Sequence, residues 1–460
     1  MTNNKNSIEQ DSFSGSIAAF FATLGSAVGL GNIWMFPYIT GENGGGAFLL
    51  IYLGCVFFVG LPILIAEYAL GRRARSNTVA AYEKLGGSAK WQIPGWMGVV
   101  SSFFILFFYT AVAGWTYYYF YLSLFGSFQG ITQEGAKNTF AAMSSSSFLS
   151  VSFQWIVVFC TAGIIFLGVR RGIESVSKRL MPLLFVLLIL CVIQALRLPN
   201  SFEGVKFLFV ADFSKLTSNS ILIALGLAFF KLSLGLGSMS TYASYFQSNT
   251  NLMRNALQVV LADTMVSMLA GLAIFPAVFS FGMEPNSGPG LLFITVPMIF
   301  KQMPLGDLLL VIFFFLSASA ATMAIISMIE VPVAYLIGSW QLSRKKATFI
   351  TSLIVILVGV LAALSATPDS LIGNLKPMGK TFFDWFNFLS SSLFMPLGGL
   401  ACAILMGWCV NKSILKDELT NYGTLELGNK WIIYLFILRY ISPGLVMVIF
   451  LNALGIVNLK

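Results

Sequence analysis

The 460-residue chain contains no histidine and few charged residues. The absence of histidine removes the most common general base and the most common metal ligand, which argues against a metalloenzyme or a histidine-dependent hydrolase. Charged residues make up 10% of the chain and apolar residues 57%, whereas an ordinary soluble domain is about 25% charged. A soluble protein of this composition could not cover its surface with polar groups, so we expect a polytopic, all-α membrane protein.

The five cysteines form no C-x-x-C pair and all lie within apolar runs. We interpret them as small core residues and not as a disulfide framework or a metal site. The net charge of +9 is better explained by basic cytoplasmic loops than by a nucleic-acid partner. The cysteines are Cys55, Cys160, Cys191, Cys402 and Cys409.

Eleven apolar stretches are long enough to cross a bilayer, which takes about 20 residues each. Lys and Arg are concentrated in the N-terminal tail and the even-numbered loops, so we expect a cytoplasmic N-terminus and an external Lys460. Residues 1–14 would form a cytoplasmic tail, residues 15–410 a ten-helix core, and residues 411–460 a loop and an eleventh helix. The stretches are 15–38, 46–71, 96–125, 152–170, 180–196, 219–246, 254–281, 306–338, 346–365, 382–410 and 432–453.

Glycines interrupt the first and the sixth stretch, at Gly25-Ser-Ala-Val-Gly-Leu-Gly-Asn32 and at Ser233-Leu-Gly-Leu-Gly-Ser238. Unwound backbone at membrane depth is stable only where it is buried in protein or lines a cavity. Close packing of small residues would explain one interruption. Two interruptions, each in the first helix of a five-helix block, instead indicate an inverted-repeat transporter with a site at mid-membrane. We predict unwinding near residues 28–31 and 234–237.

Motifs along the whole chain resemble the neurotransmitter:sodium symporter family, in its bacterial LeuT-like branch. The resemblance implies a LeuT-like 5+5 inverted repeat with broken helices 1 and 6, located in the inner (plasma) membrane. It also implies an alternating-access transporter of amino acids or similar compounds, normally driven by two sodium ions. The motifs are Gly25-Ser-Ala-Val-Gly-Leu-Gly-Asn-Ile-Trp34, Gly41-Glu-Asn-Gly-Gly-Gly-Ala-Phe48, Glu67-Tyr-Ala-Leu-Gly-Arg72, Leu232-Ser-Leu-Gly-Leu-Gly237 and Arg439-Tyr440.

The resemblance implies a substrate site between the two helix breaks. The substrate carboxylate would meet the amides of Leu30 and Gly31 and the Tyr109 hydroxyl. Amine-recognising members are expected to carry an aspartate at the position of Gly29, so a glycine there leaves room for a carboxylate on the ligand. We therefore expect a carboxylate-bearing substrate, most simply an amino acid with an apolar or aromatic side chain. The amine would meet Ala27, Phe230 and Ser233, and the side chain would lie among Ile105, Phe230, Leu236, Ala324 and Met328.

The first sodium site implied by the resemblance has an unusual composition here. It would consist of the Ala27 carbonyl, Asn32, Lys231 and Asp263. An ammonium at membrane depth is costly unless it is paired, so Lys231 and Asp263 are expected to form a pair. The ammonium either replaces the sodium ion or belongs to a purely structural ion pair.

Chloride dependence is not expected, because Asp263 would supply the negative charge that chloride provides in other members. Tyr52 and Ser267 match chloride-site positions, while Leu227 replaces a polar residue.

The second sodium site implied by the resemblance is expected to be degraded. Two neighbouring hydroxyls of helix 8 are replaced by Met323 and Ala324, although sodium is a hard cation that needs oxygen ligands. Thr322 lies one residue early, which is about 100° of rotation on a helix. The remaining positions of this site are Gly25, Val28 and Ala320.

Both gates implied by the resemblance also differ. The outer Arg–Asp pair is replaced by Met35 and Asp384, and Lys380, four residues from Asp384, is a candidate to pair with it locally. The inner pair is replaced by Gln10 and Gly338. We expect the gates to close by aromatic and apolar packing, with Phe230 and Tyr245 as candidates.

Three functions remain open at this point. Sodium symport is the family default, a sodium-independent proton-coupled carrier or exchanger is the alternative, and a non-transporting ligand sensor is a third. The short tails argue against a sensor. An intramembrane enzyme is disfavoured, because no nucleophile–base pair is present. We expect a small-molecule substrate, the lipid bilayer as surroundings and no cofactor besides sodium; the oligomeric state is left open.

Overall fold

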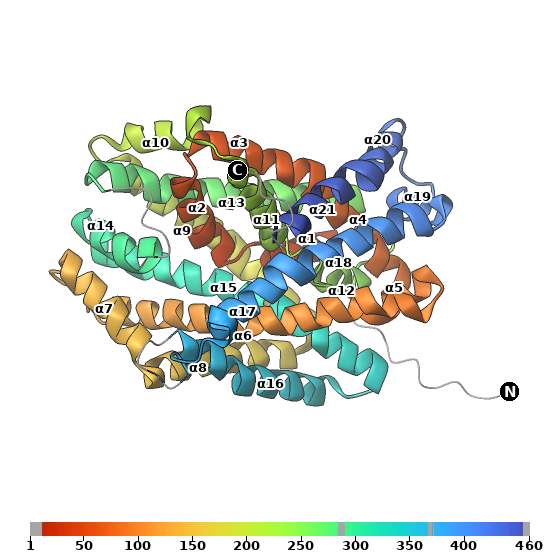
Figure 1. Cartoon of the computed structure of the whole chain (residues 1–460), viewed down its shortest axis with the longest axis horizontal. Helices are drawn as coiled ribbons and strands as arrows, with labels where there is room; N and C mark the ends of the chain where they lie inside the picture. The colour runs from red at the N-terminus through yellow and green to blue at the C-terminus, as the bar shows by residue number, and fades with distance from the viewer. Residues whose placement is uncertain (1–11, 284–289, 367–369, 371, 454–460) are drawn as a thin grey trace.

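Helices make up almost all the regular structure of the computed structural model, which describes residues 12–283, 290–366, 370 and 372–453. The expected tail up to Asp11, including Gln10, and the residues from 454 onward lie outside this part of the chain. In the described residues the only β structure is an isolated bridge between Gly45 and Ala211. The long helices run roughly parallel or antiparallel to one another (Figure 1).

Nine helices in the described part of the chain are long and apolar enough to cross a membrane. Proline and π-type turns occur inside several of them without ending the span. The nine are Gly46–Ala74 (α3, η2 and α4), Ala89–Leu124 (η3 and α6), Ser147–Phe166 (α8), Val169–Leu196 (η4 and α9), Leu252–Ser280 (α13), Gly306–Trp340 (α15), Arg344–Ser365 (α16), Phe382–Cys409 (α17, η8, α18 and η9) and Lys430–Asn452 (α20, η10 and α21).

A tenth span is broken. Helix α1 (Ser16–Ala27) and the helical segment Gly31–Glu42 (η1 and α2) are bent by 54° relative to each other. At the break Val28 is extended, with φ −80° and ψ 112°. The interruption predicted near residues 28–31 is therefore confirmed.

The sixth expected span is also interrupted. Six residues, 232–237, separate helix α11 (Ser218–Lys231) from α12 (Ser238–Ser244). Neither helix is long enough to cross a bilayer alone. Three residues between them, Ser233, Gly235 and Gly237, have positive φ values of 51°, 75° and 77°. A Cβ on Gly235 would lie 2.1 Å from the Met395 carbonyl oxygen. The described residues thus contain nine spanning helices and one bent pair, and α11 and α12 lie where the sequence predicts the sixth span.

Several short helices connect the spans where the sequence predicted only loops. Their lengths of 7 to 13 residues are too short for a membrane-spanning pattern, so a search for spans cannot find them. They are α5 (Thr78–Gly86), α7 (Gln133–Ser145), α10 (Ser201–Phe209), α14 (Val296–Gln302, preceded by η6, Leu291–Thr295) and α19 (Lys412–Leu419).

The spans divide into central and peripheral helices. In the most apolar windows of α6 and α15, 78% and 83% of the residues are buried in the protein, against 39% in α8 and 44% in α16. Helices α8 and α16 pack against each other along one edge of the bundle (Figure 1). The central helices therefore surround the breaks, and the outer faces of α8 and α16 are left for lipid.

Candidate substrate and ion site

The two helix breaks lie against each other in the interior. The Ser233 hydroxyl donates a hydrogen bond to the Ser26 carbonyl over 2.9 Å. A Cβ on Gly31 would lie 3.2 Å from the Lys231 side chain and 3.6 Å from the Phe230 ring. The unwound segments of helices 1 and 6 thus bring backbone groups and side chains of both repeats to one place.

Tyr109 on α6 reaches the first break. Its hydroxyl accepts a hydrogen bond from the Leu30 amide over 2.8 Å. A Cβ on Gly29 would lie 2.7 Å from the same hydroxyl and 3.1 Å from the Ala324 Cβ. An aspartate side chain at position 29 would therefore collide with Tyr109 as it stands in this structure.

The other residues expected at the substrate are apolar and mostly buried. Phe230 is partly exposed, and its ring centre lies 6.5 Å from that of Tyr109. Phe230 and Met35 line a cavity of about 430 Å³ between η1, α11, η8 and α21. The remaining expected residues are buried in the core and do not line this cavity: Ala27, Ile105, Leu236, Ala324 and Met328.

Lys231 ends α11 and points into a closed polar cluster. Its ammonium lies 3.1 Å from the Asp263 carboxylate on α13, and both side chains are completely buried. It donates hydrogen bonds to the Tyr52 hydroxyl over 2.7 Å and to the Ser267 hydroxyl. The rings of Phe36 and Tyr52 have their centres 5.1 and 4.7 Å from the ammonium, within range of a cation–π interaction. The pair expected from the sequence is present, and Tyr52 and Ser267 are partners of the ammonium.

Asn32 is oriented as a donor toward this cluster. Its amide nitrogen donates to the Asp263 carboxylate over 2.6 Å and to the Ser267 hydroxyl over 3.1 Å. Its amide oxygen accepts from the Gly29 amide over 3.1 Å. Because the Gly29 amide can only donate and the Asp263 carboxylate accepts, these partners fix the orientation of the amide. The Asn32 oxygen thus faces the Gly29 amide, and the Lys231 ammonium already binds the Asp263 carboxylate, so the cluster as it stands does not fit sodium.

The second expected ion site is crowded by a methionine. A Cβ on Gly25 would lie 2.7 Å from the Met323 terminal methyl. The Thr322 hydroxyl is hydrogen-bonded to the Tyr117 hydroxyl of α6 over 2.6 Å. It also donates to the Ala318 carbonyl of its own helix, α15, over 2.7 Å. Val28, Ala320 and Ala324 are buried around it and bring no side-chain oxygen.

The end of the bundle at the N-terminal segment, which the Lys/Arg distribution predicts to be the cytoplasmic or inner end, is closed by aromatic rings and by an ion pair. Phe13 is fully buried, with its ring centre 5.9 Å from that of Tyr245. The Tyr245 hydroxyl donates to the Glu330 carboxylate over 2.7 Å, and Arg344 donates to both oxygens of Glu330 over 2.9 and 3.0 Å. The expectation of aromatic and apolar packing is incomplete at this end: Tyr245 does pack on Phe13, but Arg344 is also present as the charged partner that the buried Glu330 carboxylate needs. Gly338 lies nearby, its Cβ position 2.6 Å from the Asn77 amide nitrogen.

At the outer end, Asp384 binds a partner other than Lys380. Asp384 forms a capping box with Thr381 at the start of α17, and Lys380 stacks over the Phe388 ring at 3.9 Å. No Lys380–Asp384 ion pair occurs among the described residues. Capping satisfies the first amides of the helix and takes up the carboxylate, so the expected local pair does not form.

The sequence analysis assigns no role to two buried carboxylates that lie at the sixth-helix break and at the inner end. Glu330 closes the inner end, and Glu67 accepts a hydrogen bond from the Gly235 amide over 2.7 Å at the sixth-helix break. Both are charged residues within apolar spans, which by itself marks a functional or structural role. That signal was present in the sequence.

Comparison with known proteins agrees with this arrangement. The family model described as "Sodium:neurotransmitter symporter family" matches residues 10–146 and 138–459. The "Uncharacterized sodium-dependent transporter YhdH" of Bacillus subtilis is 39% identical over 442 residues, covering 96% of this chain and 97% of that protein. An "Uncharacterized sodium-dependent transporter" of Haemophilus influenzae is 34% identical over 463 residues, covering 98% and 99% of the two chains.

A solved structure is similar over nearly the whole chain. The crystal structure of MhsT in complex with L-phenylalanine superimposes with a TM-score of 0.89 at 39% identity, covering 96% of this chain and 99% of that one. This match and the broken helices confirm the all-helical, LeuT-like membrane fold. The chain therefore belongs to the sodium:neurotransmitter symporter family and is a multi-pass membrane transporter, not an enzyme.

Proposed function

We propose that the chain is a secondary active transporter of an amino acid with an apolar or aromatic side chain, located in the plasma membrane. The substrate carboxylate would bind at the Leu30 and Gly31 amides and the Tyr109 hydroxyl. The amine would bind near the Ala27 and Phe230 carbonyls and Ser233. Apolar residues dominate the surroundings, and the relative MhsT was crystallised with L-phenylalanine. Gly29 supports a ligand that carries its own carboxylate.

The coupling mechanism rests on one observation, the buried Lys231–Asp263 pair. We infer that the ammonium takes the place of one sodium ion. It is surrounded by the oxygens of Asp263, Tyr52 and Ser267, much as an ion would be. Removing one member of a buried pair leaves an unpaired charge, which costs about 3–5 kcal/mol. The pair is therefore expected to persist through the transport cycle, so that the first site contributes no sodium dependence.

A second candidate function is carriage that does not depend on sodium at all. The observation that favours it is the Met323 methyl packed against Gly25. A thioether is a poor ligand for a hard cation. Under this alternative, protons or exchange with a second solute would drive transport. The relatives are named as sodium-dependent transporters, which favours a remaining sodium requirement that would then depend on the second site.

Uptake into proteoliposomes distinguishes these proposals. Labelled L-phenylalanine uptake is measured against external sodium for the wild type, Lys231→Thr and Lys231→Ala. In Lys231→Thr the Asp263 carboxylate loses its partner while a new hydroxyl appears, so we expect a sodium dependence steeper than in the wild type. Lys231→Ala exposes the same carboxylate without a hydroxyl and should be more damaging.

Two results would overturn the proposal. One is a steep wild-type dependence that corresponds to two sodium ions per substrate. The other is an unchanged sodium response in Lys231→Thr. A wild type that takes up phenethylamine better than L-phenylalanine would instead contradict the carboxylate assignment.

A further inference from the structure

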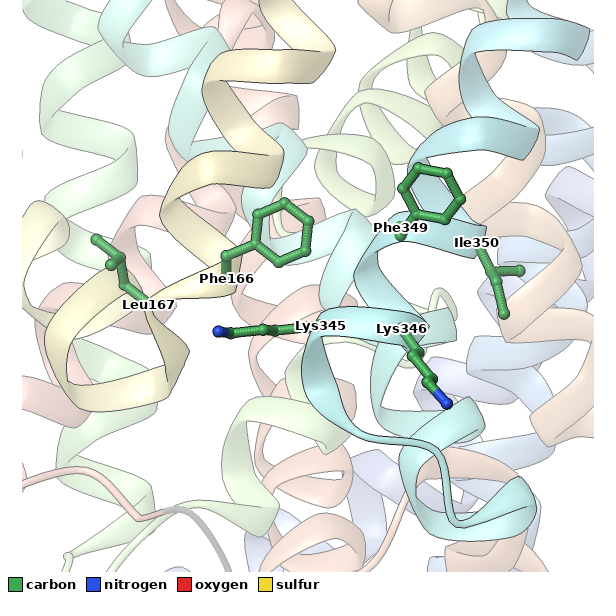
Figure 2. Close-up of a pocket in the computed structure, with 6 residues that line it drawn as sticks. All are labelled: Phe166, Leu167, Lys345, Lys346, Phe349 and Ile350. Carbon is green, nitrogen blue, oxygen red and sulfur yellow. The ribbon is translucent and has the colours of Figure 1, made fainter.

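A groove of about 770 Å³ lies at the edge of the bundle, where α8 ends and α16 begins. Phe166 and Leu167 form one side of it, and four residues of the first turns of α16 form the other (Figure 2). Phe166, Leu167 and Phe349 are 38%, 60% and 60% exposed. The four residues of α16 are Lys345, Lys346, Phe349 and Ile350.

The position of the groove relates it to the membrane. Helices α8 and α16 are peripheral spans, with less than half of their most apolar windows buried in the protein. The next span begins with η4 (Val169–Glu174), just after Leu167, and its Arg170 donates hydrogen bonds to the Ser12 carbonyl and hydroxyl. The groove therefore lies at the same end of the bundle as the N-terminal segment, the end that the Lys/Arg distribution predicts to be cytoplasmic. Its apolar half continues along helices that face lipid.

The groove carries positive charge without a partner. Lys345 and Lys346 form no ion pair or hydrogen bond with any residue in the described part of the chain, whereas the adjacent Arg344 is bound to Glu330. Figure 2 shows the Lys345 side chain extending from α16 toward α8, below the Phe166 ring. The chain has no Asp or Glu between Glu330 and Asp369, nor between Glu134 and Glu174. No carboxylate of the described residues forms an ion pair with Lys345 or Lys346, so the two lysines make the local potential positive.

We propose that this groove binds an anionic phospholipid of the adjoining leaflet. The phosphate lies at the Lys345 ammonium, Lys346 adds to the positive potential, and an acyl chain covers Phe166, Phe349 and Ile350. Basic residues beside membrane-embedded helices recognise anionic lipids in this way. A second copy of the chain is a poorer occupant, because it would have to bring acidic groups to a face whose loops are rich in Lys and Arg.

Native mass spectrometry of the full-length protein tests the site with phosphatidylglycerol, phosphatidylcholine and inorganic phosphate as probes. We expect the wild type to retain phosphatidylglycerol, and Lys345→Gln/Lys346→Gln to bind it about 30-fold more weakly, from about five-fold for each lysine near a membrane surface. The control Lys412→Gln/Lys416→Gln removes the same charge from exposed positions on α19 and should bind as the wild type does. Lys345→Arg/Lys346→Arg keeps the charge and should retain the lipid.

Several outcomes would overturn the site. Equal retention of phosphatidylglycerol by the Gln variant and the wild type is one, and equal binding of phosphatidylcholine is another. Displacement of the lipid by millimolar inorganic phosphate would show that the groove recognises an anion and not a lipid. If Phe349→Cys forms a dimer without bound lipid, and the dimer protects the new cysteine from a thiol reagent, the groove is an interface with a second copy. If the Gln variant does not fold, Phe349→Ala is tested in its place. We expect this variant to retain less phosphatidylglycerol than the wild type, and unchanged retention would contradict the site.

Discussion

The Tyr109 hydroxyl connects α6 to the first helix break through its hydrogen bond from the Leu30 amide. We expect Tyr109→Phe to weaken L-phenylalanine binding by about 1.5–3 kcal/mol, because a hydrogen bond to a charged carboxylate is lost. That loss corresponds to a Kd about 10- to 150-fold higher, measurable by calorimetry on the purified transporter.

Tyr117→Phe is the matched control for this prediction. Tyr117 is on the same helix, and its hydroxyl is hydrogen-bonded to Thr322 and not to the break. This variant should bind L-phenylalanine as the wild type does. If Tyr109→Phe also binds normally, the carboxylate is held elsewhere.

At the scale of single residues, the sequence predicts which buried charges form a pair better than it predicts the other groups that contact them. Lys231 and Asp263 were paired because buried charges need partners, and the structure contains that pair. Tyr52 and Ser267 were assigned to chloride by resemblance, yet in the structure both contact the ammonium. The Lys380–Asp384 pair fails because Asp384 satisfies a capping box instead. Such competition between local partners depends on geometry that sequence spacing does not contain.

At the scale of helices, the break in the sixth span depends on glycines with positive φ. Gly235 has φ 75°, and its Cβ position is 2.1 Å from the Met395 carbonyl oxygen. Backbone atoms cannot move aside as a flexible side chain can. We therefore expect Gly235→Ala to destabilise the protein by more than about 3 kcal/mol, as overpacking and backbone strain add. Thermal unfolding in detergent measures the effect.

Gly226 provides the control within the same span. It lies inside α11, and a Cβ there would have no heavy atom within 4 Å. Gly226→Ala should leave stability unchanged or raise it by about 0.5–1 kcal/mol, because alanine is the better helix former. Similar melting temperatures for the two variants would show that the break does not require the conformation seen at Gly235.

The sequence predicts the long elements and the breaks well, for a physical reason. A span must satisfy its backbone inside an apolar stretch of about 20 residues, so composition alone marks it. Glycine pairs then mark where the helix stops. Short connecting helices such as α7 and α10 have no such constraint. They are stabilised by packing on the bundle, and that packing is not written in the local pattern.

At the scale of the whole molecule, alternating access requires an inner end that opens and closes. In this structure that end is closed by Phe13 packed on Tyr245, and by Glu330, which bonds both Tyr245 and Arg344. Phe13 belongs to the N-terminal segment and Tyr245 directly follows α12, while Glu330 and Arg344 lie on α15 and α16. One buried carboxylate thus joins elements of different parts of the bundle, so its loss should shift the balance between closed and open states.

We expect Glu330→Ala to favour the inward-open state. The substitution removes the carboxylate that joins Arg344 to Tyr245, and the Arg344 side chain, now 15% exposed, gains hydration when the end loosens. A Ser240→Cys reporter, on the buried face of α12, should react with a cytoplasmic thiol reagent about tenfold faster or more, which corresponds to a shift of about 1.4 kcal/mol. Glu426→Ala, at an exposed position, should leave the labelling rate unchanged.

The alternative is that the aromatic contacts alone hold the inner end closed, as the sequence suggested. Phe13 is fully buried among the rings of Tyr242, Tyr245 and Phe246, and truncating a buried phenylalanine costs about 3–5 kcal/mol. Equal labelling of the wild type and Glu330→Ala, with faster labelling in Phe13→Ala, would support that alternative. Faster labelling in both variants would mean that the rings and the ion pair act as one gate, because each keeps Tyr245 in place for the other.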